Sequence, residues 1–172
     1  EFITPPADLG VPTARSMVLF TPDGHRTMNT FLGAAQHLPV TALDEQQIQS
    51  AAILYLEGYL WDPETPRYAM IKAIDVARSA GRKLAFTLSA TFSISRHPNG
   101  FNQLIDSGRV DILFANEGEI QALAGVPHFD TALAAVQGKV ATLVVTRSEK
   151  GAIAVSNGIR AEVPAGPVAQ VV

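Results

Sequence analysis

The sequence predicts an α/β fold in which helices cover both faces of a mainly parallel sheet, a three-layer α/β/α sandwich. Four short apolar runs lie within residues 43–146 and are separated by segments with helical periodicity, the pattern of successive βαβ units. The composition agrees, because 47% of the 172 residues are hydrophobic and 17% are charged. These proportions support a sizeable core in a chain of ordinary domain length.

The first elements are expected to form a lid or edge hairpin over residues 14–32. Residues 14–21 and 26–32 are β-prone and flank the turn signal Pro22-Asp23-Gly24. A short helix over residues 43–50 and a buried strand over residues 51–57 follow. The βαβ units of residues 43–146 therefore begin directly after the hairpin.

Helices and strands then alternate. Apolar residues at helical spacing predict a helix over residues 63–80. The elements expected next are a strand over 83–88, a loop at 98–100, a helix near 101–106, a strand over 110–115, helices over 117–124 and 128–137, and a strand over 141–146. A second hairpin is predicted over residues 151–163, around the turn Asn157-Gly158. Nothing marks a domain boundary, so residues 1–172 are expected to belong to one α/β unit.

Composition also narrows the classes of function. The 13 basic and 16 acidic residues include no basic block, which argues against a nucleic-acid partner. No apolar run reaches the length of a membrane span and the first residues lack the pattern of a secretory signal, so we expect a cytoplasmic protein without a membrane partner. The absence of cysteine excludes disulfides and thiol nucleophiles. The four histidines show no metal-binding spacing.

Candidate binding residues lie where the predicted strands end, because ligands of open parallel sheets bind at the carboxyl ends of strands. Asn116 and Glu119 follow one such strand and open a helix. Their spacing fits a capping box, in which the two side chains bond to free backbone N–H groups. The alternative is that these two oxygen-bearing side chains hold a hydrated Mg²⁺ and, through it, the phosphates of a nucleotide. The residues alone leave both interpretations open.

The connection over residues 146–151 also has two interpretations. It is either a simple polar turn or a loop whose backbone N–H groups and Thr146 hydroxyl approach a phosphate. Neither GxxxxGK[ST] nor GxGxxG occurs, so no Walker A loop and no dinucleotide fold is predicted. Arg26 is either a solvated turn residue or a guanidinium aimed at a phosphate. Phe92 either anchors its loop or stacks on a planar ring.

Five segments, in this order and spacing, resemble the PfkB/ribokinase family of sugar and nucleoside kinases, and above all its adenosine-kinase branch. They are TARSMVLFTPDGHRTMNTFLGAA, YLEGYLWD, LAFTLSATF, VDILFANEGE and LVVTRSEKGAIAV, and they cover nearly the whole chain. The resemblance implies a ribokinase-like fold with a small β-lid. It also implies ATP- and Mg²⁺-dependent phosphoryl transfer to the primary hydroxyl of a nucleoside, most of all adenosine, or of a sugar. A homodimer is compatible with it.

The resemblance further implies roles for single residues on the nucleotide side. Asn116 and Glu119 match the family's NxxE motif, which supports Mg²⁺ and phosphate binding. Thr146, Ser148 and Gly151 match its TxGxxG nucleotide loop, with Ser148 in the place of the usual glycine.

On the acceptor side, Arg26 matches an arginine near the transferred phosphoryl group. The positions that match the lining of the nucleoside or sugar pocket are Met17, Met28, Thr30, Leu60 and Phe92. An apolar lining that bears an aromatic ring suits a purine better than a bare sugar, which needs more hydrogen-bonding side chains.

One family motif does not occur in the chain. This is DTxGAGD, which supplies an anion hole and the catalytic base, and the N-terminal strands that grip the ribose hydroxyls are also missing. The chain is therefore expected to be a central fragment, incomplete at both ends, and inactive by itself. The alternatives are a non-catalytic nucleoside- or sugar-binding module and a structural α/β fragment without activity.

Overall fold

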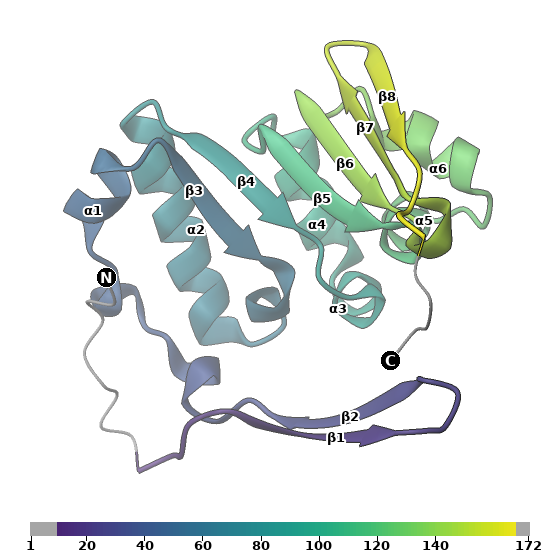
Figure 1. The fold of residues 1–172 in the computed structure, drawn as a ribbon. Helices are drawn as coiled ribbons and strands as arrows, with labels where there is room; N and C mark the ends of the chain where they lie inside the picture. The colour runs from purple at the N-terminus through teal and green to yellow at the C-terminus, as the bar shows by residue number, and fades with distance from the viewer. Residues whose placement is uncertain (1–9, 168–172) are drawn as a thin grey trace.

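The computed structural model describes residues 10–167 (Figure 1). Residues 1–9 and 168–172, at the two ends of the expected unit, lie outside the described residues. The strands are β1 (Arg15–Phe20), β2 (Arg26–Phe31), β3 (Ile53–Glu57), β4 (Lys83–Thr87), β5 (Ile112–Asn116), β6 (Thr142–Thr146), β7 (Ala152–Ser156) and β8 (Ile159–Val163). The α-helices are α1 (Glu45–Ser50), α2 (Glu64–Ser79), α3 (Thr91–Arg96), α4 (Pro98–Asp106), α5 (Glu117–Ala124) and α6 (Phe129–Val136). The short 3-10 helices are η1 (Gly33–His37), η2 (Val40–Ala42), η3 (Gly58–Trp61) and η4 (Ser148–Lys150).

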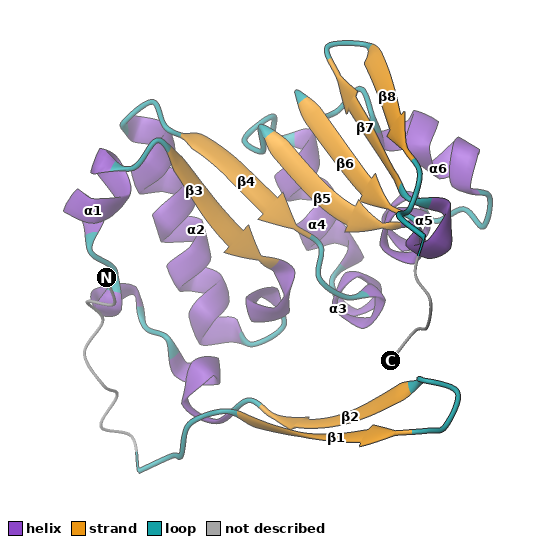
Figure 2. Cartoon of the chain, viewed as in Figure 1, coloured by secondary structure: helices purple, strands orange, loops and turns teal. Residues whose placement is uncertain are grey.

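Six of the strands form one sheet in the order β3-β4-β5-β6-β7-β8. β3 to β6 are parallel, and β7 and β8 continue the sheet as antiparallel neighbours. Helices connect the parallel strands (Figure 2), as the alternating pattern predicts. The predicted α/β fold with a mainly parallel sheet is confirmed.

Two helical segments differ from prediction. α4 begins at Pro98, inside the stretch that was expected to be a loop, because proline is well tolerated at the first position of a helix. α3 occupies part of the loop expected between β4 and α4. Its sequence, TFSISR, has no strong helical period, and the helix is fixed by tertiary packing, since Ser93 and Ile94 are fully buried.

The core lies on the face of the sheet that the helices cover. Alternate residues of the strands point to this face and are buried, as the period of two requires. They are Leu84, Phe86, Leu113, Ala115, Leu143, Val145, Ile153 and Val155. Aromatic rings fill the space below β4, where Phe86 meets Phe101 of α4 and both meet Trp61 of η3.

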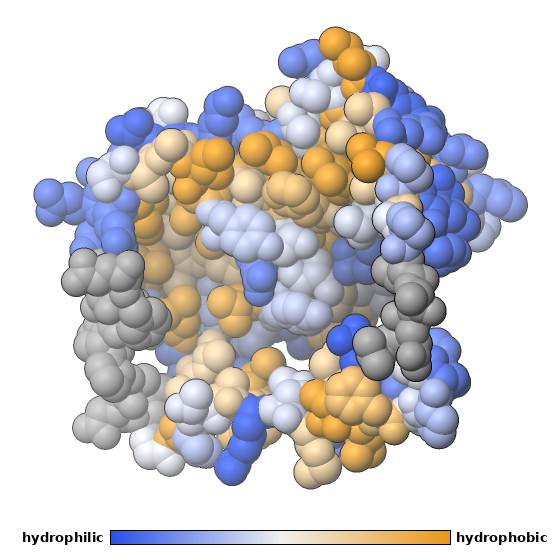
Figure 3. Space-filling model, in the orientation of Figure 1, coloured by the Kyte–Doolittle hydropathy of each residue, from blue (hydrophilic) through white to orange (hydrophobic). Residues whose placement is uncertain are grey.

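The opposite face of the sheet differs from the prediction that helices cover both faces. Within residues 10–167 this face is open, and Figure 3 shows apolar side chains gathered over the strands. Tyr55, Phe114 and Ile159 on this face are exposed. The strands are apolar on both faces, which is typical of burial on both, but the described residues supply the helical layer for only one.

The β1–β2 hairpin forms a sheet of its own, as predicted. All residues of both strands are exposed, and the hairpin extends below the edge at which the parallel strands end (Figure 1). Among residues 10–167, no helix combines the length and the apolarity needed to cross a membrane.

Candidate functional site

Two neighbouring cavities lie at the carboxyl ends of β4, β5 and β6. One has a volume of about 270 Å³ and the other of about 260 Å³. Asn116 and Thr146 line both. The first is completed by Glu117, Gly118 and residues 147–150, and the second by Thr87, Ser89, Phe114, Ala115, Glu119 and Val144. This is the edge of the sheet where the sequence predicts ligand binding.

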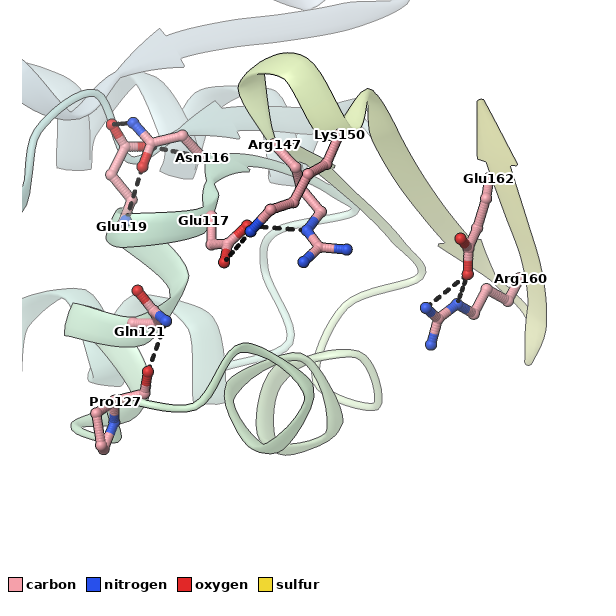
Figure 4. A network of polar contacts seen from close by, with 9 residues as sticks. All are labelled: Asn116, Glu117, Glu119, Gln121, Pro127, Arg147, Lys150, Arg160 and Glu162. Atoms are coloured by element: carbon pink, nitrogen blue, oxygen red, sulfur yellow. Dashed lines mark hydrogen bonds and ion pairs between the residues drawn. The ribbon is translucent and has the colours of Figure 1, made fainter. Parts of the chain in front are cut away.

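Asn116 and Glu119 meet at the junction of β5 and α5. The Asn116 backbone N–H donates to Glu119 Oε2 at 2.9 Å, and Asn116 Nδ2 donates to Oε1 at 2.8 Å. The Glu119 backbone N–H donates back to Asn116 Oδ1 at 2.8 Å (Figure 4). The predicted capping box is therefore confirmed.

Glu119 is a buried carboxylate, with only 5% of its surface exposed. Burial raises its pKa, and the hydrogen bond from the Asn116 backbone opposes this rise. Each carboxylate oxygen accepts one bond from Asn116 and has room for a second. Among residues 10–167, no three His, Asp or Glu side chains form a cluster that could hold a metal ion. The site suits Mg²⁺ nonetheless, because this ion keeps most of its waters and needs only one or two carboxylates beside substrate phosphates.

Glu117, Arg147 and Lys150 form a charged cluster at the mouth of the first cavity (Figure 4). Arg147 Nε donates to Glu117 Oε2 at 2.9 Å, and Lys150 Nζ lies 3.6 Å from Oε1. The hydrogen bond from Arg147 lowers the pKa of Glu117, and the charges of Arg147 and Lys150 add to this. The Arg147 guanidinium also lies over the Phe129 ring, with Cζ 3.8 Å from the ring centroid. The loop after β6 is thus anchored to α5 and α6.

The backbone of that loop takes conformations that favour glycine. Ser148 has a φ of 49°, in the left-handed region, and Gly151 has a φ of 84°. A Cβ atom on Gly151 would lie 2.0 Å from the carbonyl oxygen of Val163, so no other residue fits there. Residue 148 has a backbone conformation that glycine adopts without strain, but the residue at this position is serine.

Leu60 and Phe92 lie farther along the same edge, after β3 and β4. Leu60 is in η3 and is partly buried against the core, and Phe92 is in α3. The neighbour of Leu60, Tyr59, has its ring centroid 6.4 Å from that of Phe92. Sequence reasoning missed Tyr59, and the YLEGYLWD segment that contains it was the only signal.

The hairpin residues divide between two faces. In an antiparallel pair, residues directly opposite each other share a face, so Met28, which pairs with Val18, shares its face with Thr30 and Arg26. Met17 pairs with Asn29 and lies on the other face. Of the three hairpin residues that match the pocket lining, Met28 and Thr30 therefore share a face and Met17 does not. Neighbouring residues of a strand point to opposite sides, and Met17 and Val18 are neighbours.

The structure brings four of the predicted residues together around the two cavities. They are Asn116, Glu119, Thr146 and Ser148. The charged side chains of Glu117, Arg147 and Lys150 were missed as site residues. The acidic pair in NEGE and the basic pair in TRSEK were the signals that could have found them.

Each comparison with known proteins finds that this chain is similar to kinases. A family model described as pfkB family carbohydrate kinase matches residues 7–172. The guanosine-inosine kinase of Escherichia coli strain K12 is 32% identical over 117 residues, which is 66% of this chain and 27% of that protein. The crystal structure of adenosine kinase from Sinorhizobium meliloti is 40% identical with a TM-score of 0.89, covering 95% of this chain and 50% of that one. A probable sugar kinase from Rhizobium etli CFN 42 is 36% identical with a TM-score of 0.92, covering 98% and 51%. The chain thus spans about half the length of these solved relatives.

Proposed function

This chain belongs to the pfkB family of carbohydrate kinases, and we propose that the full-length protein transfers the γ-phosphoryl group of ATP to a primary hydroxyl of a purine nucleoside. Adenosine is the leading acceptor, and guanosine and inosine are the next. The two relatives that are named as nucleoside kinases support this class of acceptor. The apolar and aromatic side chains near β3 and β4 support it as well.

The observation that carries the proposal is the pair of cavities joined at Asn116 and Thr146. Phosphoryl transfer needs little covalent chemistry from a protein and depends on positioning and on stabilising charge. One cavity is lined by the loop after β6, whose Arg147 and Lys150 side chains would meet phosphate groups, and the other leads along the edge toward β4. A nucleotide in the first cavity would have its terminal phosphate directed toward the second.

On this proposal, the loop over residues 146–151 contacts the phosphates through backbone N–H groups, the Thr146 hydroxyl and Lys150. Asn116 and Glu119 would hold Mg²⁺ through its waters, beside Glu117, which lines the first cavity together with Asn116. The metal ion supplies positive charge that offsets the phosphate charge.

The acceptor would lie between the carboxyl edge and the hairpin. Leu60 and Phe92 form its wall on the sheet side, and Met28 and Thr30 contact it from the hairpin. Arg26 shares the face of Met28 and would reach the transferred phosphoryl group. Met17, on the other face of the hairpin, has no part in this arrangement.

An ATP-coupled assay of the full-length protein tests the proposal. Adenosine, guanosine, inosine, ribose, fructose and 2-keto-3-deoxygluconate are compared at equal concentrations. We expect kcat/KM for at least one purine nucleoside to exceed that of every free sugar. Phosphorylation of none of the six would overturn the kinase proposal, and preference for a sugar would overturn the acceptor class. Calorimetric binding of adenosine without phosphorylation would favour a binding module instead.

A further inference from the structure

The segments that follow β3 and β4 are hydrogen-bonded to each other directly after the two strands end. The Gly58 backbone N–H donates to Ser89 Oγ at 3.0 Å, across a sequence separation of 31 residues. Ser89 has a φ of 66°, and a Cβ atom on Gly58 would lie 2.4 Å from the Leu88 carbonyl oxygen. Such close approach of two backbones leaves little freedom at the base of both segments.

The outer ends of the same two segments are joined through Asp62. Its carboxylate accepts a hydrogen bond from Arg96 Nη1 at 2.7 Å and one from His97 Nε2 at 3.0 Å. Arg67 Nη1 lies 3.4 Å from His97 Nδ1. Because arginine can only donate, Nδ1 accepts and Nε2 carries the proton that bonds to Asp62. The Asp62 and His97 side chains are partly buried.

Arg96 connects this ion pair to the aromatic residues. Its guanidinium carbon lies 5.2 Å from the centroid of the Phe92 ring while Nη1 bonds to Asp62. Phe92 in turn faces Tyr59, at an interplanar angle of 38°. Phe92 is 49% exposed and Tyr59 46%, so both rings keep surface for a ligand. Ser89, which accepts the hydrogen bond from Gly58, lines the second cavity.

We propose that Asp62 is a positioning residue for the acceptor: through Arg96 it fixes Phe92 beside Tyr59, so that the two rings form a wall for the planar purine base. Tyr59 then contacts the substrate directly. The inference rests on the proposed nucleoside kinase function. An ion pair with a largely exposed arginine contributes little to stability, so the effect of Asp62 falls on geometry.

The test uses the full-length enzyme and its variants Asp62→Asn, Arg96→Gln and Arg96→Lys, with adenosine and ATP as probes. We expect Asp62→Asn and Arg96→Gln to raise the KM for adenosine by about tenfold, because small displacements of a positioning group are costly. The KM for ATP and the melting temperature should stay nearly unchanged. The double variant Asp62→Asn/Arg96→Gln should raise the KM for adenosine no further than Asp62→Asn alone, since both changes remove the contact between Arg96 and Asp62. Arg96→Lys keeps the charge but not the planar group and should be intermediate.

Asp106→Asn is the matched control, because it removes an ion pair with Lys139 between the end of α4 and the segment that leads into β6, and it should leave the KM for adenosine as it is. A normal KM for adenosine in an active Asp62→Asn enzyme would overturn the inference and leave the proposed function standing. If the wild-type protein phosphorylates no nucleoside, the proposed function fails. Amide hydrogen exchange then tests whether Asp62 holds the segments after β3 and β4 together. Faster exchange confined to residues 58–62 and 91–97 in Asp62→Asn supports it, and unchanged exchange overturns it.

Discussion

Asn116 and Glu119 bond to each other three times, through two backbone N–H groups and one side-chain amide. The carboxylate that caps α5 is therefore the same one that faces the second cavity. Any ligand that engages Glu119 acts on a group whose position is already fixed by the start of a helix. Such a group needs little reorganisation when a ligand binds to it.

Replacement of Glu119 by Gln should lower both stability and turnover. The Gln amide nitrogen would face one of two Asn116 donors, so at least one hydrogen bond is lost. We expect the free energy of unfolding in urea to fall by about 1–3 kcal/mol. We expect kcat to fall by a larger factor than the KM for adenosine rises. Glu45→Gln, at an exposed ion pair with Lys72, is the control and should change stability by less than about 0.5 kcal/mol. Equal losses in kcat and in nucleoside affinity would contradict a role at the metal and phosphates.

The ion pair between Glu117 and Arg147 predicts a pH dependence of stability. Because Arg147 lowers the pKa of Glu117 in the folded state below its ordinary value of 4.5, the folded state favours the ionised carboxylate. The stabilisation is fully present above pH 4.5 and is lost as the pH falls through the lowered pKa. The difference in melting temperature between wild type and Glu117→Gln should therefore shrink on acidification. A difference that grew toward low pH would show that Glu117 acts in another way.

Replacement of Ser148 by Gly should raise stability. The left-handed backbone at this position costs a non-glycine residue roughly 1–2 kcal/mol, and the greater freedom of glycine in the unfolded chain cancels part of the gain. We expect a net increase of up to about 1 kcal/mol in the free energy of unfolding. Ser79→Gly, at the end of α2, should have the opposite sign. A loss of stability in Ser148→Gly would mean that the serine hydroxyl makes a compensating contact.

Replacement of Gly58 by Ala should destabilise the protein by about 1–3 kcal/mol. The new methyl group would press on the Leu88 carbonyl, which is part of the backbone and cannot turn away. Gly138→Ala is the matched control, because no atom lies within 4 Å of its added Cβ. Thermal unfolding of the two variants should separate them clearly. Equal melting temperatures would mean that residues 58 and 88 move apart at little cost.

Replacement of Arg26 by Ala should raise the activation free energy of phosphoryl transfer by about 2–4 kcal/mol if the Arg26 guanidinium stabilises developing charge. The melting temperature should not change, because Arg26 is exposed. Arg15→Ala provides the control on the same hairpin, since Arg15 pairs with Phe31 on the opposite face. Single-turnover kinetics of both variants give the measurement. An unchanged rate for Arg26→Ala would return this residue to the role of a solvated turn arginine.

Local pattern was enough to predict most of the fold. The strands β3 to β6 and helix α2 were found because each has a sustained period and a clear boundary. Helix α3 was not found, because its helical form depends on burying Ser93 and Ile94 against segments distant in sequence. The resemblance groups Met17 with Met28 and Thr30 by position, and it does not state which way each side chain points, so the separation of Met17 from the other two follows only from the strand register.

The candidate site also combines contacts that can be predicted from the sequence with contacts that cannot. Asn116 and Glu119 are three residues apart, so their contact follows from helix geometry and could be predicted. Asp62 and Arg96 are 34 residues apart, and Glu117 and Arg147 are 30 apart. Such pairs form only because neighbouring parallel strands deliver their ends to one edge. The sequence contains the charges but not the distances between them.

The antiparallel end of the sheet determines where the chain emerges. β7 reverses the direction of β6, and β8 reverses it again, so β8 runs in the same direction as the parallel strands. An even number of reversals preserves polarity. Val163 consequently ends in register with Ala152 and, across it, with Thr146, and the backbone of residues 163–165 passes directly over Gly151. The two antiparallel strands β7 and β8 therefore return the polypeptide to the loop that follows β6.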